Sequence, residues 1–241
     1  MPSSLRLSQT HSIKHPNKYI KSLLYDFKGW AFDEESALSH KGKWKEIFFQ
    51  TFKKNLLHLE IGPGTGTHFA QLCSKYPKEC FLAIELKYKP LIQTITKIRN
   101  SNYQNGKVIR YNAKFLEKLF TKKELNNIYI HFPDPWPKNK HKKHRLIDDS
   151  FVEKLYQAQQ DRAFLELKTD DKSYFFESVE AIKKGGYNMI KYSENLYETH
   201  PEDPDFLKNL SQFELIFFNK NQPIYYSLFQ KEEVLRENCN F

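Results

Sequence analysis

One carboxylate stands in a proline-rich segment that follows an apolar run. Ile128–Phe132 is apolar, and the chain continues Phe132-Pro-Asp-Pro-Trp-Pro-Lys138. Because closely spaced prolines exclude helix and inner strand, we expect Asp134 in a rigid loop just after a short buried strand. Open α/β sheets place their ligands at that edge. A carboxylate beside an aromatic side chain, Trp136, favours a site that handles a base, although a Pro-Asp-Pro segment alone is usually a plain turn.

Positive charge is concentrated directly after this segment. Five cationic side chains occur within eight residues, with two histidines among them. Such a cluster can hold the phosphates of a nucleic acid, whereas an ordinary charge run is a solvated face. We expect these residues to contact RNA: Lys138, Lys140, His141, Lys142, Lys143, His144 and Arg145.

A second motif is rich in glycine. Leu56–Thr67 reads as a strand, a turn and a helix start, with Glu60 just before Gly62, Gly64 and Gly66. Glycines let the backbone turn sharply and let a ligand approach it closely. The spacing differs from the G-x-G-x-x-G of dinucleotide folds. An acid followed by three close glycines fits S-adenosylmethionine better, because its ammonium and sulfonium need a nearby carboxylate.

Two polar residues end the next strands. Glu85 closes an apolar strand roughly 20 residues after the glycines, where a carboxylate accepts from ribose hydroxyls in nucleoside-binding folds. Asn112 closes the third strand and can accept from an adenine amino group through its carbonyl oxygen. We therefore expect a nucleoside pocket at this edge.

The elements that must position these residues alternate along the chain. The pattern predicts an α/β fold with a doubly wound, mostly parallel seven-stranded sheet, helices on both faces and an antiparallel strand near the C-terminus. Residues 34–53 should contain a helix covering the first strand, and 193–222 a mobile insertion. Expected strands are 56–61, 81–86, 108–112, 128–132, 163–167, 187–192 and 224–230, and expected helices are 67–76, 88–100, 115–121, 148–160 and 172–184.

Length and composition bound the organisation. The 241 residues suit a flexible basic arm over 1–30 and one domain over 31–241, and a net charge of +9 favours a polyanionic partner. Cysteine spacing indicates reduced thiols, and we expect a soluble, cytoplasmic protein without a membrane span. We expect no metal: His131, His141 and His144 lie in a basic segment without a carboxylate partner.

The segment Phe132–Lys138, with His141, Lys143, Arg145 and Leu146, resembles the bacterial tRNA (guanine-N7-)-methyltransferase family. The resemblance implies a Rossmann-like domain that transfers methyl from S-adenosylmethionine to N7 of a guanine in tRNA, usually position 46 of the variable loop. It implies that Asp134 is both catalytic and a cofactor contact. The other implied cofactor residues are Glu60, Gly62, Gly64, Gly66, Glu85 and Asn112, the last where the family commonly has Asp.

The same resemblance implies a substrate site. Asp170 would contact the substrate, although it could equally cap the helix starting near Lys172. Guanine N7 carries a free lone pair, so the reaction needs no general base. We expect a monomer or homodimer that needs no obligatory protein partner. Alternatives are a methyltransferase for proteins or small molecules and a non-enzymatic RNA-binding module. The implied substrate residues are Lys138, Asp170, Ser211, Gln212, Phe213 and Glu214.

Overall fold

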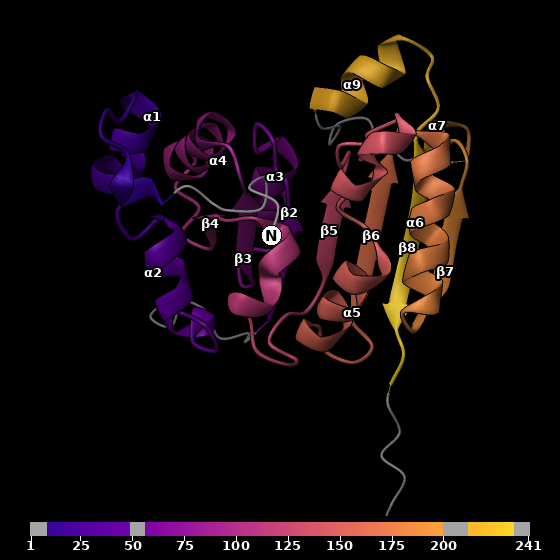
Figure 1. Ribbon diagram of the computed structural model, residues 1–241, viewed down its shortest axis with the longest axis horizontal. Coiled ribbons are helices and arrows are strands. Elements are labelled where there is room, and N and C mark those ends of the chain that lie inside the picture. The colour runs from indigo at the N-terminus through magenta and orange to yellow at the C-terminus, as the bar shows by residue number, and fades with distance from the viewer. Residues whose placement is uncertain (1–8, 49–55, 200–211, 234–241) are drawn as a thin grey trace, which may run out of the picture.

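The computed structural model describes residues 9–48, 56–199 and 212–233, and its centre is one twisted sheet (Figure 1). The strand order is β1-β4-β3-β2-β5-β6-β8-β7. All neighbours pair in parallel except β8, which runs antiparallel between β6 and β7. The strands are β1 Ala31–Phe32, β2 Leu57–Ile61, β3 Cys80–Glu85, β4 Gly106–Arg110, β5 Ile128–His131, β6 Phe164–Thr169, β7 Tyr187–Ser193 and β8 Tyr225–Lys231.

This order makes the sheet doubly wound. The chain builds outward through β2, β3 and β4, then crosses back to place β5 on the other side of β2. The point between β2 and β5 is therefore the topological switch at which such sheets bind ligands. The predicted fold class and all seven expected strands are confirmed. The eighth strand, β1, was not predicted, because its two residues are too few to show an alternating or apolar pattern.

Helices cover both faces. One face is packed by η3 (Ser22–Asp26), α3 (Thr67–Lys75) and α4 (Tyr88–Asn100). The opposite face is packed by α5 (Asp149–Ala158) and α6 (Lys172–Lys184). Helix α9 lies across the carboxyl ends of the strands (Figure 1). The remaining elements are η2 Thr10–Ser12, α1 Lys18–Lys21, α2 Glu34–Ser39, η4 Trp44–Phe48, η5 Ala113–Lys118, η6 Asn139–His144, α7 Leu196–Thr199 and α9 Gln212–Asn219.

Local chemistry explains where helices begin and end. Asp148 and Asp171 cap α5 and α6 by accepting hydrogen bonds from Phe151 N and Tyr174 N, at 2.9 and 2.8 Å. The prediction of an α-helix at 115–121 is wrong, because the segment forms a 3₁₀ helix that begins at Ala113 and ends at Lys118. Phe115 interrupts it with φ −114° and ψ 31°.

The N-terminal segment packs against the domain from residue 9 onward. Ile20, Leu23 and Phe27 are each at most 4% exposed. Residues 9–30, expected to be part of a flexible arm, therefore pack against the domain, because apolar side chains are interspersed among the basic ones. Residues 1–8 lie outside the described part of the chain.

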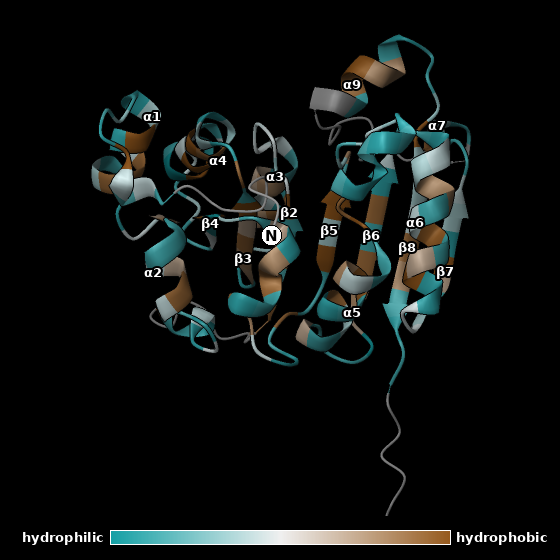
Figure 2. Ribbon diagram, viewed as in Figure 1, coloured by the Kyte–Doolittle hydropathy of each residue, from teal (hydrophilic) through white to brown (hydrophobic). Residues whose placement is uncertain are grey.

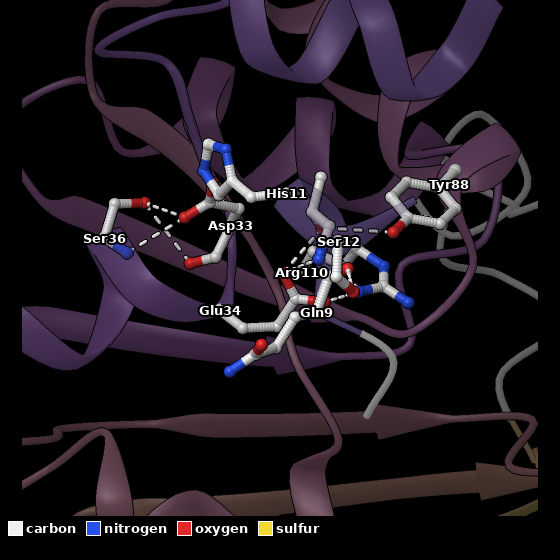
Figure 3. Close-up of polar contacts among 9 residues, drawn as sticks. Gln9, His11, Ser12, Asp33, Glu34, Ser36, Tyr88 and Arg110 are labelled. Carbon is white, nitrogen blue, oxygen red and sulfur yellow. Dashed lines mark hydrogen bonds and ion pairs between the residues drawn. The ribbon is translucent and has the colours of Figure 1, made fainter. Parts of the chain in front are cut away.

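A polar cluster ties this segment down (Figure 3). The Thr10 hydroxyl donates to Glu34 Oε2 at 2.6 Å, and Glu34 forms a buried ion pair with Arg110 at the end of β4. The Arg110 guanidinium also lies over the Tyr88 ring, 3.9 Å from its centroid. His11 Nε2 lies 2.7 Å from Asp33 Oδ2. Side chains from η2, α2, β4 and α4 are thus joined in one network.

Two further expectations concern cysteines and membranes. Cys73 and Cys80 are free and buried, in agreement with the predicted reduced thiols, and Cys239 lies outside the described residues. Burial raises the pKa of the Cys80 thiol to about 11. Over the described ranges, no helix has the length and apolar character that crossing a membrane requires.

Candidate active site

The loop after β5 is held in an unusual backbone conformation around Asp134. Phe132 and Trp136, two residues to either side, have φ of 49° and 44°, the left-handed region that bulky residues rarely adopt. Phe132 N donates to Lys168 O at 2.8 Å, which fixes the start of the loop on β6. Such backbone strain persists only where the surroundings enforce it, and it is concentrated at functional sites. Asp134 itself is exposed between the two strained residues.

Arg145 braces this loop from inside. Its Nε donates to Pro135 O at 2.7 Å, and its Nη1 forms an ion pair with Glu177. The guanidinium lies 4.8 Å from the centre of the Tyr174 ring and is only 5% exposed as a side chain. The expectation that Arg145 contacts RNA is therefore wrong, because its guanidinium is buried and paired with Glu177 inside the protein.

The glycine-rich loop has the backbone that its sequence predicts. Gly62, Gly64 and Gly66 have φ of 72°, 58° and 76°, which only glycine adopts easily. A Cβ on Gly66 would meet the Thr94 backbone at 2.7 Å, so this position also needs close packing on α4. A Cβ on Gly62 would meet nothing within 4 Å, so that glycine borders open space. The loop thus presents bare backbone at the switch point.

Glu85 lies beside this loop and within electrostatic reach of Asp134. It is 9% exposed, and its Oε1 accepts a hydrogen bond from Lys87 N at 2.8 Å. Burial is the main cause that raises the pKa of Glu85, and the charge of Asp134 raises it further. The structure therefore brings together two of the predicted cofactor residues from β3 and from the loop after β5.

Asn112 has a local role as well. Its side-chain oxygen accepts from Lys114 N at 3.1 Å and caps η5. An amide oxygen has two lone pairs, so one is left for the predicted adenine contact.

Glu60 belongs to what we call the buried polar cluster, comprising Glu60, His68, His131, Glu166, Lys168 and Glu214. Glu60 is 3% exposed and its Oε1 lies 3.2 Å from His68 Nδ1 on α3. Its other oxygen, Oε2, is buried and has no hydrogen-bond partner. Glu60 is therefore at the predicted place, but its side chain meets α3 and the neighbouring strands.

His131 corrects one sequence argument. It is the last residue of β5, not part of the basic segment, and its Nε2 lies 2.8 Å from Glu166 Oε1. The statement that no carboxylate partners this histidine is therefore wrong. Burial, followed by the charges of His68 and Lys168, lowers the pKa of His131, so its imidazole is neutral at pH 7.

Sequence reasoning missed three members of this cluster: His68, Glu166 and Lys168. The available signal was the alternation in Leu165-Glu-Leu-Lys-Thr169, which places two charged side chains on one face of β6. Lys168 Nζ pairs with Glu214 Oε1 at 2.8 Å, and Glu214 is 1% exposed. The pairing joins α9 to β6.

The predicted substrate residues are distributed unevenly. Asp170 is exposed after β6, and Asp171, not Asp170, caps α6, so the capping alternative for Asp170 is wrong. Glu214 is buried on Lys168. Gln212 and Phe213 belong to α9 although their side chains are not among those described, and Ser211 lies outside the described residues.

The basic segment forms η6 and frames Trp136. The Trp136 ring lies 5.8 Å from the His141 ring and 5.2 Å from the His144 ring, measured between centroids. Lys142 pairs with Glu177 Oε1 at 2.6 Å. The exposed lysines of this segment are Lys138, Lys140, Lys142 and Lys143. Its outer surface therefore combines positive charge with a 37% exposed indole.

These features fit a bound S-adenosylmethionine. The open backbone at Gly62 and the buried carboxylate of Glu85 offer a cradle and a ribose acceptor. Gly62, Gly64, Gly66, Glu85, Asn112 and Asp134 would hold the cofactor from the switch-point edge. Fold and site together define a class I S-adenosylmethionine-dependent methyltransferase.

Comparisons with known proteins identify the family. The family described as "Putative methyltransferase" matches residues 54–227. The tRNA (guanine-N(7)-)-methyltransferase of Bdellovibrio bacteriovorus is 34% identical over 201 residues, covering 83% of this chain and 95% of the relative. The protein of the same name from Oceanobacillus iheyensis is 32% identical over 187 residues, covering 78% and 84%. The chain belongs to the bacterial tRNA (guanine-N(7)-)-methyltransferase family.

Solved structures support the fold. An antibiotic-related methyltransferase aligns with a TM-score of 0.57 at 15% identity, covering 77% of this chain and 92% of that one. The 16S rRNA methyltransferase KamB aligns with the same TM-score at 8% identity, covering 78% and 92%. These likenesses concern the fold. Membership of the family makes the chain a methyltransferase with S-adenosylmethionine as its methyl donor.

Proposed function

We propose that this chain methylates N7 of a guanine in tRNA, position 46 of the variable loop, and forms 7-methylguanosine. The observation that carries the proposal is the exposed surface of lysines and an indole directly beside Asp134, in the loop that follows β5 at the switch point. The names of the relatives point to the same substrate. A small substrate does not require a cationic surface of this size beside the site.

Methylation of guanine N7 does not require the protein to act as a general acid or base. S-adenosylmethionine supplies a methyl group on a sulfonium. The lone pair of guanine N7 forms the new N–C bond as the S–C bond breaks, so no proton leaves the base first. Asp134 accepts from the guanine N1–H and amino group, orients the ring and stabilises its developing positive charge. The strained loop, braced by Arg145, holds Asp134 in place for this task.

The RNA backbone is held by the exposed part of η6. Lys138 would meet the base or a neighbouring phosphate, while Lys140, Lys142 and Lys143 meet the RNA backbone. Trp136, framed by His141 and His144, offers a flat apolar surface for stacking. Asp170 is exposed at the end of β6 and remains our proposed substrate contact, together with Ser211, Gln212, Phe213 and Glu214.

The test is methyl transfer to two unmodified tRNA transcripts that differ at one position. One carries guanine at position 46 and the other carries adenine there. We expect labelled methyl from S-adenosylmethionine on the first transcript only, with strand cleavage by chemistry specific for 7-methylguanine. Label on both transcripts would move the target to another base, and label on neither would remove tRNA as the substrate.

A further inference from the structure

Three side chains of the buried polar cluster converge in a manner that the methyl-transfer reaction does not use. Ligating atoms of Glu60, His68 and His131 all lie within 4.8 Å of one another. The three residues come from β2, from the first turn of α3 and from the end of β5. Two imidazoles and one carboxylate are a donor set that proteins use for zinc and related divalent ions.

Each of the three side chains has a buried polar atom without a hydrogen-bond partner. These atoms are Glu60 Oε2, His68 Nδ1 and His131 Nδ1. The only contact of His68 Nδ1 in this triangle is the 3.2 Å approach to Glu60 Oε1. Buried polar atoms are almost always satisfied by a partner. Three unsatisfied atoms on three converging side chains point to a ligand between them.

The orientation of His131 suits an ion. Glu166 Oε1 lies 2.8 Å from His131 Nε2 and accepts the proton of that nitrogen, which leaves the lone pair of Nδ1 free. A carboxylate behind a histidine is the usual arrangement that orients a metal-binding imidazole and raises its basicity.

The charges of the cluster also call for a cation. Three carboxylates, Glu60, Glu166 and Glu214, face one ammonium, Lys168, which lies 2.8 Å from Glu214 and 3.9 Å from Glu166. Carboxylates therefore outnumber ammonium groups among these side chains, and such a surrounding favours a bound cation.

An entry path exists. A cavity of about 730 Å³ is lined by His68, Tyr129, Glu166, Lys168 and Glu214, together with residues of α3. It lies on the side of the sheet that α3 covers, away from α5 and α6, and it reaches the cluster at His68. A water from this cavity could complete the coordination of an ion held by three protein ligands.

We propose that Glu60, His68 and His131 form a binding site for one divalent ion of the zinc type. Glu60 precedes the glycine-rich loop on β2 and His68 follows it on α3, so an ion bound to both would link the two ends of the loop. The site does not depend on the identity of the methyl acceptor, and its test measures metal binding directly.

The experiment uses the untagged full chain, freed of metal by a chelator and titrated with Co²⁺ as a visible probe. We expect one equivalent to bind with a d–d absorption band, without a thiolate charge-transfer band, and to be displaced by Zn²⁺. Glu166→Gln should weaken binding about 10–100-fold because it weakens the support of His131 without removing a proposed ligand. His68→Gln should weaken it at least as much. His11→Gln is the matched control, since His11 is another imidazole paired with a carboxylate.

Thermal unfolding separates loss of the site from loss of the fold. Zn²⁺ should raise the melting temperature of the wild type and of His11→Gln but not of His68→Gln, because an ion stabilises only a folded state that binds it. His68 is partly exposed, so its replacement is the variant best suited to keep the fold. Absence of the absorption band in the wild type, or unchanged affinity in folded His68→Gln and Glu166→Gln, would overturn the proposal.

Discussion

The two halves of the sheet are built on different plans. In the half that carries the glycine-rich loop, β2, β3 and β4 are buried at every residue, because helices cover both of their faces. In the other half, β6 and β8 alternate between more and less buried residues, and β7 is exposed through its centre. Figure 2 shows the contrast as brown strands in the interior and a pale β7 at the edge.

Because their burial differs, the two halves of the sheet offer different kinds of surface to a ligand. The sealed half offers a ligand mainly backbone, from the glycine-rich loop, with the buried acid Glu85 beside it. The open half offers side chains: Asp134 and η6 at the strand ends, and the buried polar cluster on the less covered face. A constant cofactor and a charged, extended substrate call for these two kinds of surface.

The sharpest stability test compares matched leucines in the two halves. Leu59 of β2 is 0% exposed, whereas Leu228 of β8 is half-buried. Leu59→Ala should lower the free energy of unfolding by about 2–5 kcal/mol, as for other fully buried leucines. Leu228→Ala should cost clearly less, because solvent already reaches its side chain. Urea unfolding of both variants checks this, and equal losses would contradict a half that is open on one face.

Activity should fail most at the junction of the halves. Asp134→Ala should lower kcat about 100–1000-fold, the usual loss when one preorganised electrostatic group is removed from a transition state. Its melting temperature and tRNA affinity should be preserved, because the side chain is exposed. Asp26→Ala, which removes another exposed aspartate, is the control. Full methyl-transfer activity in Asp134→Ala would exclude Asp134 from the mechanism.

Glu85→Gln should separate function from stability. Loss of a charged acceptor for the ribose should weaken S-adenosylmethionine binding roughly 10–100-fold, corresponding to about 1.5–3 kcal/mol. Burial raises the pKa of Glu85, so its ionisation opposes folding once the pH exceeds the unfolded-state value of 4.5. The variant should therefore be as stable as the wild type or more stable at pH 7. Calorimetric titration with S-adenosylmethionine measures the affinity, and melting curves measure the stability. A variant that is less stable than the wild type but binds the cofactor normally would refute both predictions.

The smallest effect should come from the exposed lysines. Lys140 and Lys143 are exposed, whereas Lys142 is partly engaged with Glu177. Replacing Lys140 and Lys143 together with Ala should weaken tRNA binding and reduce its salt dependence by roughly one unit of slope per lost phosphate contact. Lys183→Ala on α6 serves as the control. An unchanged slope would mean that η6 does not meet the RNA backbone.

Most of the sealed half could be predicted from the sequence. Continuous apolar runs such as Cys80–Glu85 have a single interpretation when glycine and helix-forming segments border them. The strict conformational demand at Gly62, Gly64 and Gly66 is likewise local. Glu85, the last residue of β3, and Asp134, in the loop after β5, could be predicted as candidate site residues because each follows an apolar run.

What escaped prediction depends on contacts between distant segments. Arg145 looks like its lysine neighbours until Pro135, Tyr174 and Glu177 surround it. The partnership of His131 and Glu166 is set by the register of β5 against β6, which no local pattern specifies. The N-terminal segment is polar on average, and only its few buried side chains reveal that it packs.

The docking of that segment has a consequence for biosynthesis. Thr10 meets Arg110 across 100 residues, and β1 pairs with β4. During synthesis this segment leaves the ribosome well before its partners in β4 and α4 are made. Leu23 and Phe27 therefore have no complete surface to cover them until β4 has emerged. A segment that is synthesised early is thus secured late, and its apolar side chains stay uncovered in the nascent chain until β4 is available.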